Sequence, residues 1–500
     1  MRFKAVMYRG IAGLLLSALL LASCGDTAAP AIDTADTGVT ENTTTAPETE
    51  PTHDANGYLL DDIPDTLDYN GKTVTILTWN HYEPIEFYAT EQSGEIVNDA
   101  YHTRNLHVEE RLKVKLAFKE ANGRYRQNDF ADTVINAVAA GTGDYDLTAG
   151  YSLGVAGLVL NGVYNNLLKV EHLDFTKPWW SQQMVDSITI ADTLFFTTGD
   201  ICSSSISRMQ GIFFNADMIK EHNLENPYTL TVDGKWTIDK MFTMSKGMYK
   251  DLNANNTKDE ADRFGFTVDR TQLQPTFFTS GMRAVETDAS GKLVLSKLLA
   301  GERAVNVLNK FATFLHTSSD AIIVAKTDDN STFYEGRALF HAFPLAIITN
   351  ENIRSAKFNY GFVPWPKLNE EDNHVIIHSN AFTLWSIPKG VSDVSMSGAL
   401  METMASEGHR TIAPALFETA YKVKYNTDSS SLQSRIFDEM RAGILVDVGR
   451  VFANVLPYSI SKFANMIVEN ADTWVSSIES NRSAFNQTLT DIYEACKKNA

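Results

Sequence analysis

Residues 72–79 read Lys-Thr-Val-Thr-Ile-Leu-Thr-Trp, and this run of β-branched and apolar side chains predicts a buried strand. Apolar residues at helical spacing follow over 95–113, and a second strand is expected over 114–118. A helix over 130–140 and a third strand over 146–149 continue the alternation. Strands and helices that alternate in this way predict a parallel sheet with helical crossovers, and therefore an α/β fold.

Ligands of such sheets bind beyond the carboxyl ends of the strands. The first strand runs into residues 79–81 and the third into residues 150–152. Because parallel strands end at the same edge, we expect Trp79, Asn80 and Tyr151 to lie at one crevice.

Length, composition and charge limit the class of protein. The chain has 500 residues, of which 44% are hydrophobic and 21% charged, so it should form at least two globular lobes. Its formal net charge is -19. Such an acidic chain repels phosphate backbones and anionic headgroups, which argues against nucleic-acid binding and favours neutral or positively charged partners.

The first 24 residues have the pattern of a bacterial lipoprotein signal. Basic residues precede an apolar run over 11–21, and Leu21-Ala22-Ser23-Cys24 follows. The run is shorter than the ~20 residues of a membrane span. We expect residues 1–23 to be removed and Cys24 to carry the lipid, palmitate included, so that the protein is anchored at the extracytoplasmic face of the cell membrane.

Residues 24–69 are rich in Thr, Ala and acidic residues, and this composition predicts a disordered tether. The two remaining cysteines, Cys202 and Cys496, are far apart in the sequence, and we expect both to be unpaired thiols. No cysteine pair has the spacing of a zinc site.

Four later motifs, taken with the strand pattern, carry a family resemblance. They are Tyr145-Asp146-Leu147 before Tyr151, Phe214-Asn215-Ala216-Asp217 with Trp236-Thr237 after it, Phe333-x-x-Gly336-x-Ala338-Leu339, and Tyr360-Gly361-x-x-Pro364. In this order the chain resembles the family 1 extracellular solute-binding proteins of ABC importers, the family that includes maltose-binding protein.

The resemblance implies a two-lobe, periplasmic-binding-protein-like (type II) α/β fold with a ligand cleft between the lobes. The first lobe would comprise 70–198 and 383–428, and the second 199–382 and 429–500. The family's members close their lobes around a solute and pass it to a membrane permease. The resemblance thus implies a monomeric carbohydrate receptor that needs no cofactor and is not an enzyme.

Sugar sites combine aromatic faces with a few polar groups. The candidate ligand-binding residues are Trp79, Asn80, Tyr151, Trp179, Trp180, Asp200, Arg208 and Phe343. Phe343 lies in the region where maltose-binding relatives place a stacking aromatic. Trp236 and Trp365 are assigned to packing.

Residues 251–262 have the pattern of an EF-hand or dockerin calcium loop. The expected Ca²⁺ ligands are Asp251, Asn253, Asn255, the Thr257 carbonyl, Asp259 and Asp262. Asn256 replaces the usual turn glycine, which Asn tolerates because it enters the left-handed region more easily than most residues. An alternative is a surface turn that binds nothing.

Two other classes of protein stay open from the sequence. A lipid-anchored carbohydrate-active enzyme would need two carboxylates across a cleft, and no motif singles out such a pair. A binding protein for a peptide or another non-sugar solute would use similar lobes with charged anchors for the ligand's termini.

Overall fold

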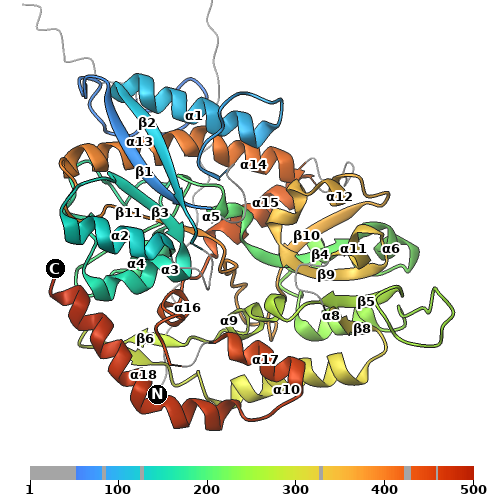
Figure 1. Cartoon of the computed structure of the whole chain (residues 1–500). Helices are drawn as coiled ribbons and strands as arrows, with labels where there is room; N and C mark the ends of the chain where they lie inside the picture. The colour runs from blue at the N-terminus through green and yellow to red at the C-terminus, as the bar shows by residue number, and fades with distance from the viewer. Residues whose placement is uncertain (1–51, 81–85, 124–128, 326–329, 422–429, 458–459) are drawn as a thin grey trace, which may run out of the picture. The chain divides into compact units, whose positions relative to one another are not determined.

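The first sheet is centred on β1 (Lys72–Trp79), which pairs in parallel with β2 (Val114–Ala121) and with β3 (Leu147–Tyr151). The fourth strand, β11 (Thr383–Ser386), pairs antiparallel with β3, so the order is β11-β3-β1-β2. The predicted parallel arrangement of the first three strands is confirmed. Figure 1 shows this sheet between α1 and α2.

These coordinates are a computed structural model that describes residues 52–80, 86–123, 129–325, 330–421, 430–457 and 460–500. His53–Ala500 form one unit. The predicted signal residues, Cys24 and most of the predicted tether lie outside the described residues. No helix of the described residues is both long enough and apolar enough to cross a membrane.

The second sheet is mixed. Its order is β10 (Tyr360–Pro364), β4 (Gln210–Asn215), β9 (Ala338–Pro344), β5 (Phe264–Val268) and β8 (Ala321–Ile323). The pairs β10–β4 and β4–β9 are antiparallel, whereas β5 is parallel to both β9 and β8. A short hairpin of β6 (Val285–Thr287) and β7 (Leu293–Leu295) stands apart from both sheets.

Helices make up most of the remaining described chain. The α-helices up to the end of the second sheet are α1 Ile96–Leu112, α2 Asp129–Ala140, α3 Ser152–Gly157, α4 Gln182–Ile188, α5 Ser204–Ser207, α6 Ala216–Glu221, α7 Pro227–Val232, α8 Ile238–Ser245, α9 Pro275–Thr279, α10 Glu302–Thr317, α11 Ser331–Tyr334 and α12 Glu351–Arg354. The later α-helices are α13 Val394–Arg410, α14 Ile412–Tyr421, α15 Ser430–Ala442, α16 Val448–Val451, α17 Ser461–Glu469 and α18 Trp474–Lys497. Short 3-10 helices are η2 Leu158–Asn161, η3 Leu167–Lys169, η4 Thr271–Leu273 and η5 Leu345–Thr349.

Local sequence accounts for several helix boundaries. Asn215 ends β4 and caps α6, accepting a hydrogen bond from the Met218 amide. Thr237 caps α8 in the same way, as its hydroxyl oxygen accepts from the Lys240 amide at 3.2 Å. Gly336 has a φ of +74°, a conformation that favours glycine and separates α11 from β9.

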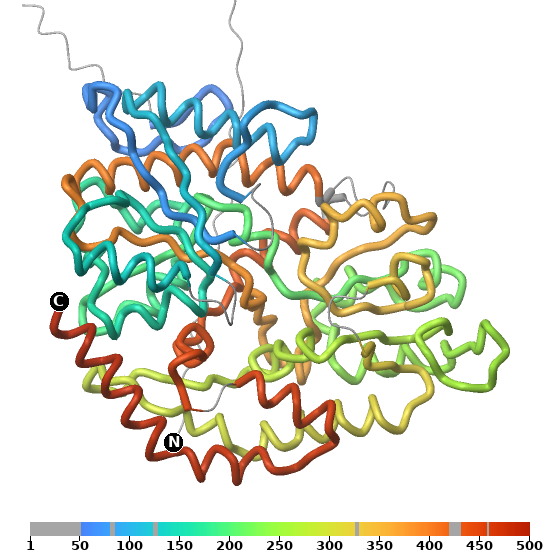
Figure 2. The backbone as a smooth tube through the Cα atoms, in the orientation of Figure 1, coloured from blue at the N-terminus to red at the C-terminus, as the bar shows by residue number. Residues whose placement is uncertain are grey.

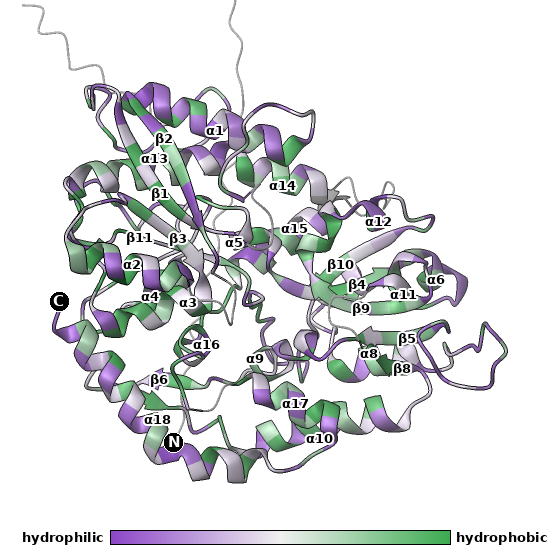
Figure 3. Ribbon diagram, viewed as in Figure 1, coloured by the Kyte–Doolittle hydropathy of each residue, from purple (hydrophilic) through white to green (hydrophobic). Residues whose placement is uncertain are grey.

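Two long amphipathic helices, α10 and α18, lie at the lower edge of the molecule as drawn in Figure 1. Figure 3 shows α10 and α18 with hydrophobic and hydrophilic residues in alternation along each ribbon. The buried side chains of α18 include Trp474, Ile478 and Phe485, and the Trp474 indole N–H donates to the Leu299 carbonyl at 2.7 Å. This pattern is typical of a helix that packs one face on the core.

Three stretches of chain lie side by side near the two sheets, and we call 208–210, 376–379 and 443–445 the crossing segments. The first leads into β4, and the second lies between β10 and β11 (Figure 2). The Gln210 amide donates to the Ile377 carbonyl at 2.8 Å, and the Ser379 amide donates to the Arg208 carbonyl at 2.7 Å. The third segment pairs with the second through a bridge between Ile376 and Ile444.

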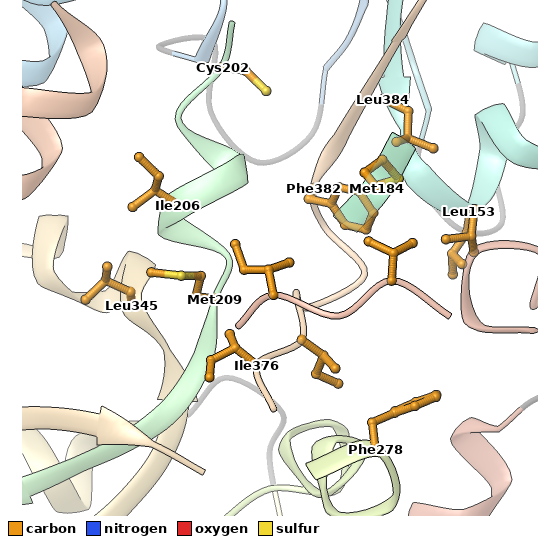
Figure 4. Close-up of a cluster of buried hydrophobic side chains, with 14 of the residues drawn as sticks. Leu153, Met184, Cys202, Ile206, Met209, Phe278, Leu345, Ile376, Phe382 and Leu384 are labelled. Atoms are coloured by element: carbon orange, nitrogen blue, oxygen red, sulfur yellow. The ribbon is translucent and has the colours of Figure 1, made fainter. Parts of the chain in front are cut away.

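Buried apolar side chains support the crossing segments. Figure 4 shows Met209 and Ile376 on two of them, with Ile206 just upstream and Leu345 nearby. Each of these side chains is at least 95% buried. Full burial of one such side chain contributes about 1.5–3 kcal/mol relative to exposure, so the segments are anchored by packing as well as by hydrogen bonds.

Candidate functional site

A cavity of about 1400 Å³ is lined by residues that belong to both sheets and to the crossing segments. The first sheet supplies Trp79 at the end of β1 and Tyr151 at the end of β3. The second supplies Gln210 at the start of β4 and Phe343 near the end of β9. Pockets for drug-sized ligands have about 300–1,000 Å³, so this cavity has room for a larger ligand.

Aromatic rings form part of the cavity wall. Trp79 and Tyr151 pack against each other with ring centroids 5.2 Å apart and tilted by 46°. The Trp79 indole N–H donates to the Thr383 hydroxyl at 2.9 Å, which fixes the ring on β11. Phe343, from the other sheet, is stacked with His341 at 6.0 Å and remains partly exposed.

Buried polar atoms without a hydrogen-bond partner gather at this cavity. Five of them belong to residues that line it, namely Glu86 Oε1, Gln210 Oε1, Gln272 Oε1, Ser379 Oγ and Arg450 Nε. Buried polar groups in folded proteins almost always have a partner, because leaving one unpaired costs ~1–3 kcal/mol. A ligand with several hydroxyl groups would supply both the donors and the acceptors that these atoms lack once the lining side chains turn toward it.

Glu86 and Arg208 both belong to the cavity lining. Burial raises the pKa of the Glu86 carboxyl, while hydrogen bonds with Ser204 and Thr383 and the positive charge of Arg208 oppose that rise. The sequence indicated Arg208 but not Glu86. The signal for Glu86 is its position shortly after β1, at the strand edge where ligands are expected.

Arg450 is a buried cation of the lining and comes from α16. Its terminal nitrogens donate to the His378 carbonyl at 2.7 Å and to the Gln274 carboxamide oxygen at 3.3 Å. The side-chain NH₂ group of Asn380 donates to that same Gln274 oxygen at 3.4 Å. Burial lowers the pKa of the Arg450 guanidinium to about 10, so this group is still a cation at neutral pH.

His378 holds the second crossing segment against α5. Its Nε2 lies 2.8 Å from the Ser205 carbonyl, to which it donates, and its ring stacks on Phe382 at 4.8 Å. Burial lowers the pKa of His378 to about 4, with the charge of Arg450 acting in the same direction. The imidazole is therefore neutral at physiological pH and acts as a fixed support for the cavity wall.

The structure brings four of the eight predicted ligand residues together, since Trp79, Tyr151, Arg208 and Phe343 all line the cavity. Asn80 is exposed and its amide continues the ladder between β1 and β2 by donating to the Ala121 carbonyl. It is not among the residues of the lining.

Trp179 and Trp180 lie in the core and away from the lining. The Trp179 indole N–H donates to Oε1 of Glu402, on α13, and the Trp180 indole N–H donates to Oε2 of the same carboxyl, each at 2.9 Å. Burial raises the pKa of the Glu402 carboxyl to about 7, against the effect of these hydrogen bonds. The two tryptophans therefore pack and hydrogen-bond inside the first-sheet region. In the second-sheet region Trp236 and Trp365 are also buried, and the Trp236 indole N–H donates to the Pro364 carbonyl at 2.8 Å.

Asp200 also lies outside the lining and is 2% exposed. One of its carboxyl oxygens accepts from His409 Nδ1 at 2.6 Å and from the Arg441 guanidinium. Arg441 is near the end of α15, just before the third crossing segment. Asp200 thus ties the start of α5 to α13 and to that segment.

The predicted calcium loop is folded largely by its own side chains. Asp251 Oδ2 accepts from the Asn256 amide at 2.9 Å, and Asn256 has a φ of +59°, the left-handed conformation expected for it. Asn253 and Asn255 both donate to Asp259. The oxygens of the buried Asp262 accept from the Leu252 and Asp259 amides and from the Tyr249 hydroxyl.

One oxygen of this loop differs from the rest, because Asp251 Oδ1 is buried without a hydrogen-bond partner. Among the described residues, no group of three or more His, Cys, Asp or Glu side chains is placed to hold a metal ion. The expected Ca²⁺ ligands also include two asparagines and the Thr257 carbonyl, which are oxygen ligands of the kind that Ca²⁺ prefers. The carboxylates of Asp259 and Asp262, however, already accept hydrogen bonds from other residues of the loop.

Cys202 and Cys496 are both free and buried, which confirms that they are unpaired. Burial raises the pKa of each thiol to about 12, so neither is a reactive thiolate at neutral pH.

No protein-family model matches this chain, and a search of curated proteins finds no match. Solved structures do match it. An ABC substrate-binding protein from Listeria monocytogenes in complex with cycloalternan aligns with a TM-score of 0.55 and 12% identity, covering 84% of this chain and 99% of that one.

Two further structures align over similar lengths. The cyclic alpha-maltosyl-1,6-maltose binding protein from Arthrobacter globiformis gives a TM-score of 0.53 and 12% identity, over 86% of this chain and 100% of that one. A cyclo/maltodextrin-binding protein complexed with maltotetraose gives 0.52 and 13%, over 85% and 98%. At such identities the likeness concerns the fold. The chain therefore has the two-lobe α/β fold of ABC substrate-binding proteins, as the sequence resemblance implied.

Proposed function

We propose that this protein captures a carbohydrate in the cavity between its two sheets and delivers it, chemically unchanged, to an ABC importer. The observation that carries the proposal is the combination of aromatic faces with five buried polar atoms that lack partners. Sugar rings offer apolar faces to Trp79, Tyr151 and Phe343, and their hydroxyls can both donate to and accept from the polar atoms. The shared fold supports the same function.

The direct test is isothermal calorimetry of the purified protein against a panel of oligosaccharides, with analysis of the sugar after incubation. We expect saturable binding and recovery of the intact ligand. Release of shortened products would support the alternative of a carbohydrate-active enzyme instead. Binding of peptides, with no binding of any sugar, would favour the alternative of a peptide-binding protein.

We also propose that ligand binding closes two lobes, made of residues 70–198 with 383–428 and of 199–382 with 429–500. The crossing segments would act as the hinge, because they connect the sheets through few residues. A ligand that touches both lobes stabilises the closed state by its difference in affinity for the two states. Small-angle X-ray scattering should show a smaller radius of gyration with ligand, and no change would contradict closure.

The anchoring of the protein is a further proposal. Cys24 would carry the lipid at the extracytoplasmic face, and the folded part would act there as a monomer beside its permease. Incorporation of labelled palmitate into the wild-type protein, and its loss in Cys24→Ser, is the expected result. Equal labelling of both proteins would contradict it.

The loop at 251–262 is proposed as a structural Ca²⁺ site of modest affinity. The supporting observation is Asp251, whose Oδ2 accepts from the Asn256 amide and whose Oδ1 is buried without a hydrogen-bond partner. Millimolar Ca²⁺ should raise the melting temperature of the wild-type protein and leave that of Asp251→Ala unchanged. Asp288→Ala, in another exposed turn, is a matched control that should keep the shift. No shift in the wild-type protein would rule the site out.

A further inference from the structure

The charges of the cavity lining differ in sign from those of the whole chain. The chain carries a net charge of -19, whereas the lining contains three arginines and two glutamates, namely Arg208, Arg354, Arg450, Glu86 and Glu95. The formal charge of the lining is therefore 3 − 2 = +1, in a chain that is acidic as a whole.

Two of these arginines have an acidic neighbour in the lining. Arg354 lies 3.3 Å from a carboxylate oxygen of Glu95 in an exposed ion pair. Arg208 lies close enough to Glu86 to oppose the rise in its pKa.

Arg450 is different, because its guanidinium donates to two neutral acceptors, its Cζ lies 5.7 Å from the centre of the Phe278 ring, and its Nε has no hydrogen-bond partner. Asp447 caps the start of the same helix, and its two oxygens accept from the backbone amides of Arg450 and Ala284. Although Asp447 lowers the electrostatic cost of burying the cation, it leaves the Nε–H unpaired.

Arg104 is a useful comparison within the same protein. It is as deeply buried as Arg450, but it lies outside the lining and all three of its nitrogens have partners. These partners are the Asn105 side chain and the Ile201 and Phe87 carbonyls. The protein thus satisfies every guanidinium nitrogen of Arg104, whereas Arg450 lines the cavity and its Nε–H has no hydrogen-bond partner.

We propose that the saccharide taken by this cavity carries a carboxylate, as a uronic acid does, and that this carboxylate pairs with Arg450. The inference rests on the proposed function and narrows its ligand class. A guanidinium binds a carboxylate through charge-assisted hydrogen bonds that are about twice as strong as neutral ones, and burial in the cavity reduces screening by salt. Neutral ring faces would still pack on Trp79, Tyr151 and Phe343.

The test compares ligands that differ in charge alone. Calorimetry would use an α-1,4-linked galacturonate trimer and a mixed trimer that contains glucuronate, each beside its methyl ester. The wild-type protein should bind at least one acid at least tenfold more tightly than its ester. Methyl esters that bind as well as the acids, or a neutral oligosaccharide that binds while both acids fail, would overturn the inference and leave the proposed function intact. No binding by any saccharide would overturn both.

Variants of Arg450 then test whether the ligand's carboxylate binds at this residue. Arg450→Gln should reduce the ratio of acid to ester affinity to near one, and Arg450→Lys should restore part of it by keeping the charge. Because these changes also remove hydrogen bonds to His378 and Gln274, the melting temperature of each variant is measured first. Should neither fold, the wild-type ratio alone decides the ligand class. A folded Arg450→Gln protein that keeps the wild-type ratio would contradict the assignment to Arg450.

Discussion

The buried carboxyl of Glu402 makes a quantitative prediction about the dependence of stability on pH. Its oxygens accept from Trp179, Trp180 and the Asp174 amide, and burial raises its pKa from 4.5 to about 7. Between these values the unfolded chain loses the proton that the folded chain keeps. A raised pKa of this kind gives stability that is complete below about pH 4.5 and is lost as pH rises through about 7.

The size of this effect follows from the shift. About 2.5 pKa units at ~1.4 kcal/mol each correspond to about 3–4 kcal/mol of unfolding free energy. Glu402→Gln removes the ionisation, but a carboxamide offers one acceptor oxygen in place of two. One indole N–H then loses its partner, which costs ~1–3 kcal/mol at every pH. The variant should be less stable than the wild type at pH 5, and the two should converge by pH 8.

Urea unfolding at pH 5 and pH 8 measures the difference directly. Burial lowers the pKa of both His374 and His378 to about 4, so these groups remove stability as pH falls below about 6.5. Their effect is the same in both proteins and cancels in the comparison. Glu221→Gln, on an exposed position of α6, is the control and should keep the wild-type slope. A Glu402→Gln protein with the wild-type slope between pH 5 and 8 would refute the reasoning.

Three further predictions concern the cavity and its supports. Tyr151→Leu removes an aromatic face and should weaken oligosaccharide binding by about tenfold in calorimetry, in line with ~1.5 kcal/mol for an aromatic contact; unchanged affinity would exclude Tyr151 from the site. Glu95→Gln and Arg354→Gln each break an exposed ion pair and should change Kd less than about fivefold at low salt and not at 1 M salt; a larger effect that persists in salt would contradict a purely electrostatic role. Asp200→Asn removes the buried charge that pairs with Arg441 and should cost about 3–5 kcal/mol in urea unfolding, and a loss below 1 kcal/mol would show that the pair is dispensable.

Local sequence patterns predicted the first sheet because its three parallel strands follow one another along the chain. The helix expected over 95–113 spans 96–112, and the strand expected over 114–118 extends to Ala121. The order of the second sheet could not be predicted in this way. There β4 lies between β9 and β10, which come more than 120 residues later in the chain, and no local spacing encodes such pairs.

The same distinction explains which site residues the sequence indicated. Trp79 and Tyr151 were found because the rule about strand ends depends only on neighbouring residues. Trp179 and Trp180 were predicted as ligand residues because aromatic rings can stack on sugars. Their surroundings, however, are set by Glu402, which is more than 220 residues away in the sequence. Arg450 has no local signal, since a helix near the C-terminus brings it to the cavity.

The contacts of Arg450 also connect ligand binding with the proposed hinge. Its guanidinium donates to the carbonyl of His378, which lies in the second crossing segment, and to Gln274, at the start of α9. The next residue in that segment, Ser379, donates its amide to the Arg208 carbonyl in the first segment. A ligand group that pairs with Arg450 would therefore act on the residues that hold two crossing segments together. Variants at Arg450 should for this reason change both the affinity for the ligand and the contraction seen in scattering, whereas Tyr151→Leu, on a strand of the first sheet, should change affinity alone.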